Sequence, residues 1–172
     1  LFVLYMKDVT LEQDLNLTAR MNIVKLDKVV MNGAKSQIVY PGETTTQDFS
    51  IVKSTLNVVF LTSVRFKNLF LIHDCKIKKL TCNNIAFENE CELVLSYIEL
   101  LEFNHVDCFT RFRALGLGKY SEDKCSIKFR RVRFHNKASF DGSLLGDTDF
   151  TDCEFIGYAS FKDVRADKLR LY

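Results

Sequence analysis

Residues 127–166 read IKFRRVRFHNKASFDGSLLGDTDFTDCEFIGYASFKDVRA. The segment divides into four cells, and each cell has apolar or small side chains at the same four offsets of zero, two, five and seven. In the first cell these positions are Ile127, Phe129, Val132 and Phe134. The later cells hold Ala138, Phe140, Ser143 and Leu145, then Thr148, Phe150, Cys153 and Phe155, then Ala159, Phe161, Val164 and Ala166. The cells begin at Ile127, Ala138, Thr148 and Ala159, so their spacing alternates between 11 and 10.

The same spacing continues through most of the chain toward the N-terminus. Further cells span Leu101–Cys108, Cys91–Ile98, Leu80–Phe87, Phe70–Ile77, Val59–Phe66, Phe49–Leu56, Val29–Ser36 and Ala19–Leu26. None of the cell positions carries a charge, although the chain contains 24 Lys and Arg and 22 Asp and Glu residues. Such a consistent exclusion of charge indicates that these positions face one common core.

The spacing predicts an all-β fold. Two side chains that are two residues apart lie on one face of an extended segment, so each cell contains two short strands. The gap between them has room for a tight corner, and four sides close one coil of about 21 residues, which is two cells. Stacked coils pair backbone to backbone about 4.8 Å apart, which gives a parallel β-solenoid. An amphipathic helix is excluded because the offsets do not follow a period of 3.6.

These cells resemble the pentapeptide-repeat family. Offsets zero and five are mostly small or medium residues, as at Ala138, Ser143 and Thr148, and offsets two and seven are Phe or Leu. The similarity is strongest over residues 127–172 and more degenerate over 49–110. The resemblance implies a right-handed quadrilateral parallel β-helix.

Composition predicts one domain that spans residues 1–172. Hydrophobic residues make up 47% of the chain and charged residues 27%, which can fill a core and cover a surface. No apolar run approaches the roughly 20 residues that a membrane helix needs. We expect residues 1–18 to form an N-terminal cap or a degenerate first coil. Because the sequence begins without Met and stops in mid-cell, we also expect a fragment of a longer protein, with end-to-end association or a further domain beyond Tyr172.

The cysteines are expected to be core residues. Five occupy cell positions, and Cys125 falls outside the pattern. A buried free cysteine behaves as a small hydrophobic residue. We therefore expect a reducing, cytoplasmic location.

The sequence shows no catalytic, cofactor or metal site. His73, His105 and His135 occupy different offsets of their cells, so they should not converge. The segment LGLGK at 115–119 lacks the Gly-Lys-Ser/Thr of a phosphate loop. We expect neither a cofactor nor an enzyme activity.

Charges occur in blocks of one sign, but stacking should pair them. Residues 21 apart lie in adjacent coils, which places Asp149 over Lys128, Asp152 over Arg131 and Glu154 over Arg133. The same offsets, counted across the interrupted coil, bring Glu102 under Lys128 and Asp107 under Arg133. Opposite charges at such positions are favourable by about 0.2–1 kcal/mol. Because its cations should already be paired, the basic block over residues 111–137 is not expected to bind nucleic acid.

The first candidate interaction site is an interruption of the repeat. Between Phe112 and Ile127 the cell spacing stretches to 15, which predicts a projecting loop over residues 112–126. Loops on rigid scaffolds often carry recognition. The candidate residues are Leu115, Leu117, Lys119, Tyr120, Glu122 and Asp123. A tolerated insertion without a function is the alternative.

The second candidate interaction site is apolar material at positions that should point outward. Phe60, Leu71 and Tyr97 are its main members. An exposed apolar surface is typical of a protein interface or of a segment that a cap covers.

The expected function is a non-catalytic protein-interaction scaffold or targeting module that presents loops and a solenoid face to a protein partner. The resemblance implies one alternative, a topoisomerase (gyrase)-binding DNA mimic, since family members of that kind present an acidic rod. The net charge of +2 weakens this alternative. A β-helix enzyme is the second alternative, and it would need a clustered set of carboxylates, Arg or Lys in a groove.

Overall fold

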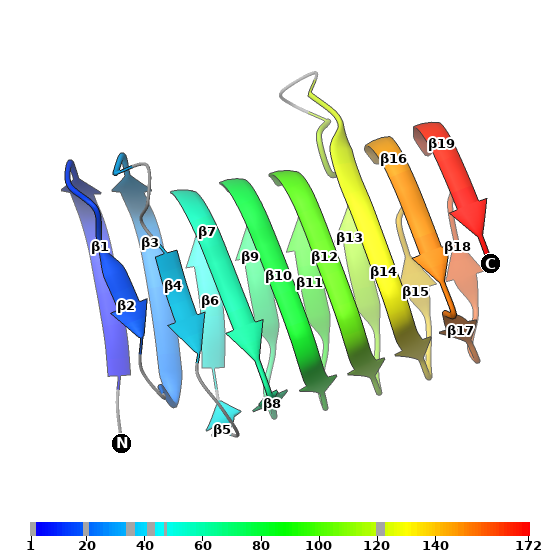
Figure 1. The fold of residues 1–172 in the computed structure, drawn as a ribbon, viewed down its shortest axis with the longest axis horizontal. Coiled ribbons are helices and arrows are strands. Elements are labelled where there is room, and N and C mark those ends of the chain that lie inside the picture. Colours follow the sequence, from blue (N-terminus) through cyan, green and yellow to red (C-terminus); the bar gives the residue numbers. More distant parts are fainter. Residues whose placement is uncertain (1–2, 19–20, 34–36, 41–43, 47, 120–122) are drawn as a thin grey trace.

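The computed structural model describes residues 3–18, 21–33, 37–40, 44–46, 48–119 and 123–172. They form a parallel β-solenoid of about seven turns, with about 21 residues per turn (Figure 1). The predicted all-β solenoid is therefore confirmed. In the described residues, no helix is long and apolar enough to cross a membrane.

The coils are built from two facing layers of strands and a short connecting side. In the layer drawn behind in Figure 1, the strands are β1 (Val3–Leu11), β3 (Ile23–Met31), β6 (Asp48–Val52), β9 (Phe70–His73), β11 (Cys91–Val94), β13 (Phe112–Leu115), β15 (Ala138–Ser139) and β18 (Ala159–Ser160). In the front layer they are β2 (Asn16–Thr18), β4 (Gln37–Tyr40), β7 (Thr55–Thr62), β10 (Lys76–Phe87), β12 (Tyr97–Cys108), β14 (Cys125–Phe134), β16 (Leu144–Thr151) and β19 (Arg165–Leu171). The short side contains β5 (Thr44–Thr46), β8 (Val64–Phe66) and β17 (Glu154–Phe155).

Every strand pairs in parallel with the corresponding strand of the next coil. Lys76 lies opposite Tyr97, Leu80 opposite Leu101 and Phe87 opposite Cys108. Paired residues in these adjacent coils are therefore one full turn apart in the sequence. The described residues before 19 follow the same rule, because β1 pairs with β3 and β2 pairs with β4. Each side chain therefore stands in a row of residues that runs along the solenoid axis.

Left-handed backbone at two corners of each central coil explains why one cell of the repeat corresponds to half a coil. Ser63, Asp74, Asn84, Leu95 and His105 follow one another at the spacing of the cells, and their φ angles lie between 50° and 54°. This conformation turns the chain sharply at a single residue. It favours Gly, Asn and Asp, and two of these five corners are Asp or Asn.

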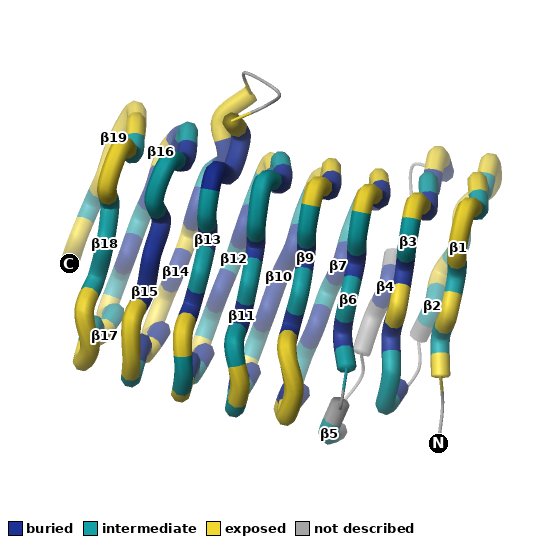
Figure 2. Tube along the Cα trace, turned by 180° about the vertical axis from the view of Figure 1, so that it is seen from behind, coloured by how far each residue is buried: buried dark blue, intermediate teal, exposed yellow. Residues whose placement is uncertain are grey.

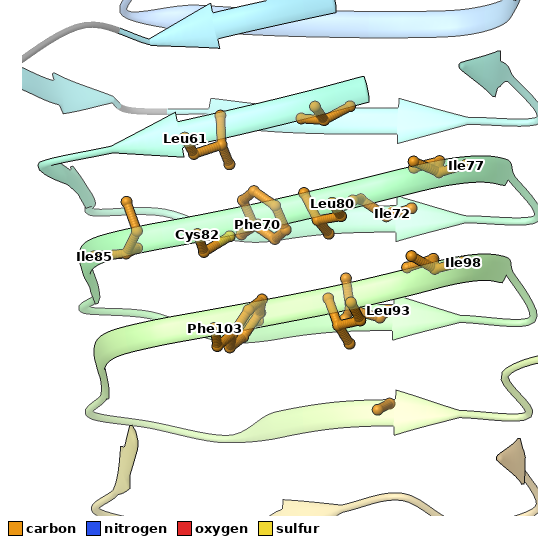
Figure 3. Packing of buried hydrophobic residues seen from close by; sticks show 14 of the residues in the cluster. Leu61, Phe70, Ile72, Ile77, Leu80, Cys82, Ile85, Leu93, Ile98 and Phe103 are labelled. Atoms are coloured by element: carbon orange, nitrogen blue, oxygen red, sulfur yellow. The ribbon is translucent and has the colours of Figure 1, made fainter. Parts of the chain in front are cut away.

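The interior between the layers is filled by the predicted cell positions. Figure 3 shows Leu61, Phe70, Leu80 and Phe103 pointing into this interior from successive coils. Phenylalanine rings stack from one coil to the next, with ring centroids 4.6 Å apart for Phe103 and Phe129. The coil that starts at residue 159 has a neighbour on one side, so its inward residues are less covered, as the exposed colour at that end in Figure 2 shows.

All six cysteines are free thiols. Cys75, Cys82, Cys91 and Cys108 are buried and Cys153 is half-buried, as their cell positions predict. Burial raises the pKa of the Cys75 thiol to about 11, and it also raises the pKa values of Cys82, Cys91 and Cys108 well above the usual value. Cysteine therefore fills space in this core as an un-ionised apolar side chain.

The position of Cys125 corrects the expectation that it lies outside the pattern. Cys125 is fully buried, and its Sγ accepts a hydrogen bond from the backbone N–H of Ile98 at 3.3 Å. It pairs with Leu145 of the next coil, so it occupies an ordinary inward position. Burial raises its pKa to about 11 as well.

The interruption of the repeat is shorter than the predicted loop of residues 112–126. Phe112, Ala114 and Leu117 are fully buried and continue the offsets zero, two and five, and Cys125 completes the cell. Inward side chains therefore anchor the coil up to Leu117 and again from Cys125. The coil is extended by five residues, since Leu101 pairs with Ile127 across 26 positions instead of 21.

Candidate binding groove across β7, β10, β12, β14 and β16

A groove of about 540 Å³ crosses the front layer of the solenoid. Its lining side chains come from five stacked strands, which Figure 1 shows side by side. The central row consists of Phe60, Thr81, Glu102, Lys128 and Asp149, each in register with the next. The groove therefore runs along the solenoid axis, perpendicular to the strands.

A second row of polar side chains lies beside the central row. It consists of Asn83, Asn104, Arg130 and Thr151, which are also in register. These positions alternate with inward residues such as Phe103 and Phe129, and this alternation turns every second side chain of the strand into the groove. The groove therefore combines one apolar end, a polar middle and two neighbouring cations.

The two carboxylates of the central row are held by groups other than Lys128. Glu102 Oε2 lies 2.8 Å from Lys79 Nζ and accepts a hydrogen bond from Thr81 Oγ1 at 3.4 Å. Asp149 accepts a hydrogen bond from Thr151 Oγ1 at 2.7 Å and lies 4.0 Å from Arg170. Both groups are thus partly neutralised within their own surroundings.

Lys128 and Arg130 remain available on the exposed side of β14. Among the residues that the structure describes, neither cation has an ion pair within 4 Å. Arg130 has Asn104 and Thr151 as its register neighbours, and neither of these can supply a charge. Two cations at successive outward positions of one strand form a place where an anionic group can bind.

Asn104 contributes an unsatisfied acceptor beside these cations. Its Oδ1 is buried and has no hydrogen-bond partner within the described part of the chain. A buried polar atom without a partner costs about 1–3 kcal/mol. The side chain lies in the groove next to Arg130.

Part of this face belongs to a recognisable repeat. The family model for pentapeptide repeats (9 copies) matches residues 126–165. This segment carries pentapeptide repeats. The pentapeptide-repeat segment includes Lys128, Arg130, Asp149 and Thr151 of the groove. Comparisons with curated proteins and with solved structures gave no match.

The predicted charge ladders are correct in register but only partly correct in pairing. Arg131 lies 3.9 Å from Asp152, as expected, and both belong to the pentapeptide-repeat segment. Arg133 lies 2.9 Å from Asp107 of the preceding coil, which was also expected. Lys128 stands opposite Asp149 and Glu102, but these carboxylates pair with Arg170 and Lys79. Diagonal neighbours are within reach of long side chains, so register alone does not decide the pairing.

The predicted apolar residues do not form one face. Phe60 of β7 lines the groove, and Leu71 of β9 lies in the opposite layer. Tyr97 is at the start of β12, where it lies under the ammonium group of Lys76, 5.7 Å from the ring centroid. The sequence offsets placed all three outward, but they did not distinguish the sides of the coil.

The predicted loop residues are separated by the structure. Leu115 belongs to β13 and Leu117 is fully buried, so neither projects, because both positions continue the coil. Lys119 and Asp123 are exposed. Tyr120 and Glu122 lie outside the described residues. Lys124, next to Asp123, forms an ion pair with Asp167.

The histidines lie apart from the groove. His105 Nε2 accepts a hydrogen bond from Arg131 at 3.0 Å, and His135 stacks on Phe109 while its Nε2 lies 3.1 Å from Asp107. His73 belongs to β9 in the other layer. In the described ranges, no three His, Cys, Asp or Glu side chains are grouped so as to hold a metal ion.

Sequence reasoning missed the polar row of the groove. Asn83 and Asn104 stand opposite each other in adjacent coils, and both come two residues after a groove-facing residue of the central row. The signal was the repetition of an amide side chain at one outward offset in consecutive coils. Amide side chains carry no charge, so the pairing of opposite charges between coils does not reveal this row.

Proposed function

We propose that this chain is a non-catalytic scaffold that binds a protein partner through its front-layer groove. The observation that supports this proposal is the pair of exposed cations, Lys128 and Arg130, in a groove that also contains Phe60 and Asn104. An apolar anchor beside charged and amide groups is typical of a protein interface. The backbone ladder keeps these groups at fixed spacings, which lowers the entropy cost of binding.

The alternation of charge also supports a scaffold over the alternative of a gyrase-binding DNA mimic. A mimic requires a continuous acidic stripe, whereas Glu102, Lys128, Asp149 and Arg170 alternate in sign along the central row. A DNA supercoiling assay separates the two functions. The scaffold should leave gyrase activity unchanged, and inhibition of supercoiling would favour the mimic.

The proposal is tested by comparing variants on two faces. The immobilised chain would be incubated with lysate of the source cells, and bound proteins would be identified by mass spectrometry. The groove variant combines Phe60→Lys with Lys128→Glu, and the matched control combines Leu71→Lys with Lys162→Glu on the opposite layer.

The expected result is a set of proteins that the wild type and the control variant retain and the groove variant loses. All four substituted side chains are at least partly exposed, so the fold should survive, and circular dichroism would verify this. Equal retention by both variants, or no protein retained specifically by the wild type, would refute the proposed groove function.

A further inference from the structure

The chemistry of the groove changes along the solenoid axis. At β7 the lining is apolar, with Val58 and Phe60, and at β14 it is cationic, with Lys128 and Arg130. Both carboxylates beside Lys128 have other partners at 2.7–2.8 Å. A ligand that fits this lining therefore carries an apolar group toward β7 and an anionic group toward β14.

The separation of these two ends can be worked out from the register. Phe60, Thr81, Glu102 and Lys128 occupy successive strands of one row, so Phe60 and Lys128 are three strand spacings apart. At about 4.8 Å per spacing, their backbones are about 14 Å apart. An extended peptide covers this distance in about four residues, at about 3.3 Å per residue.

An extended peptide also presents the two side chains in the required direction. Residues i, i+2 and i+4 of an extended chain lie on the same face, so both ends of a five-residue segment can point into the groove. Asn83 and Asn104 lie between the two ends of the groove and offer amide groups, each with a donor and an acceptor. Peptide N–H and C=O groups complement such amides.

We propose that the groove binds an extended peptide segment of the partner, in which an apolar side chain and an acidic side chain are separated by four positions. This inference rests on the proposed function, since it specifies how a protein partner is recognised. The apolar side chain contacts Phe60, and the carboxylate lies between Lys128 and Arg130. Asn83 and Asn104 bind the peptide backbone in between. The apolar end favours a peptide over an acidic oligosaccharide, which has no comparable apolar group.

The test is a selection from a random heptapeptide display library on the immobilised full chain. We expect the enriched peptides to share an aliphatic or aromatic residue and an Asp or Glu four positions away, in one consistent order. A second selection uses the variant Lys128→Glu with Arg130→Glu. Because the anion-binding end is then reversed in sign, the acidic position should change to Lys or Arg while the apolar preference remains.

Affinity measurements complete the test. A labelled peptide from the wild-type selection should bind the charge-reversed variant about tenfold more weakly in fluorescence anisotropy, and Lys162→Glu, a matched reversal on the opposite layer, should leave its Kd unchanged. Phe60→Ser should remove the apolar preference and leave the acidic one. Enriched peptides without this pair, or an acidic preference that survives charge reversal, would overturn the proposal.

The outcomes separate this inference from the proposed function. If the groove variant loses its protein partners but no peptide motif is enriched, the partner binds as a folded surface, and the peptide mode is refuted while the scaffold function stands. If an acidic oligosaccharide binds and no peptide is enriched, the groove recognises a carbohydrate and the peptide proposal fails. If neither partners nor peptides depend on the groove, both proposals fail.

Discussion

Replacing Gly118 by alanine should lower the free energy of unfolding by about 2–5 kcal/mol, because two separate costs apply at this position. The backbone has φ +73°, a left-handed conformation that costs an ordinary residue about 1–2 kcal/mol. In addition, a Cβ atom would lie 2.5 Å from the carbonyl oxygen of Asp123 and 2.9 Å from that of Leu144. Both atoms belong to the backbone, so relief requires the coil to shift, which typically costs about 1–3 kcal/mol.

Gly142 provides the matched control for this substitution. It has a similar φ of +68°, but a Cβ there would meet nothing within 4 Å. Gly142→Ala should therefore cost about 1–2 kcal/mol from the backbone alone. Urea denaturation followed by circular dichroism would measure both variants against the wild type. A Gly118→Ala variant that is no less stable than Gly142→Ala would contradict the close approach of Gly118 to the backbone of Asp123 and Leu144.

Further substitutions test the core and the corners. Phe103→Ala should lower the free energy of unfolding by about 3–5 kcal/mol because the ring is buried and stacked on Phe129. The ring of Phe109 is exposed, so Phe109→Ala should lower it by less than half as much. Equal losses in urea denaturation would contradict the burial of the Phe103 ring. Lys53→Asn should raise the free energy of unfolding by about 0.5–1 kcal/mol, since Lys53 is exposed with φ 48° and Asn tolerates this conformation. A variant less stable than the wild type in urea denaturation would argue against the left-handed corner at residue 53. The thiol of Cys75 should ionise with a pKa near 9 in the unfolded chain and a pKa of about 11 in the folded one, so its contribution to stability is present below pH 9 and is lost as pH rises toward 11. Cys75→Ala should therefore make the decline of unfolding free energy above pH 9 shallower, by up to about 1.4 kcal/mol per pH unit, and an unchanged slope would contradict the raised pKa.

The coil architecture followed from sequence because the inward positions repeat at fixed offsets. Ile127, Phe129 and Val132 are buried as the spacing predicts, and the strand register of one full turn follows from the same rule. The interruption was harder to place. Phe112 and Leu117 keep the offsets of an ordinary cell, but the five inserted residues separate them from Cys125. The spacing of the cells alone does not show that the insertion lies at the end of the cell.

The groove could be predicted less well than the core because it depends on side-chain pairing across three coils. Sequence offsets place Glu102, Lys128 and Asp149 in one row, but the choice of partner depends on side-chain reach and direction. Lys79 reaches Glu102 from a neighbouring row, and that contact leaves Lys128 available. Outward residues on different sides of a coil also look alike in sequence, which is why Phe60 and Leu71 were grouped although they lie in opposite layers.

The register of one full turn between strands also determines how such a chain can change in length during evolution. Duplication of a whole coil returns every later side chain to the side of the solenoid that it occupied before. Duplication of a single cell keeps the inward positions buried, but it moves every later outward side chain to the opposite layer. Because the groove is a set of axial rows, gene duplication by whole coils can lengthen its row of amides, whereas half-coil duplication would split the row between two faces while leaving a stable core.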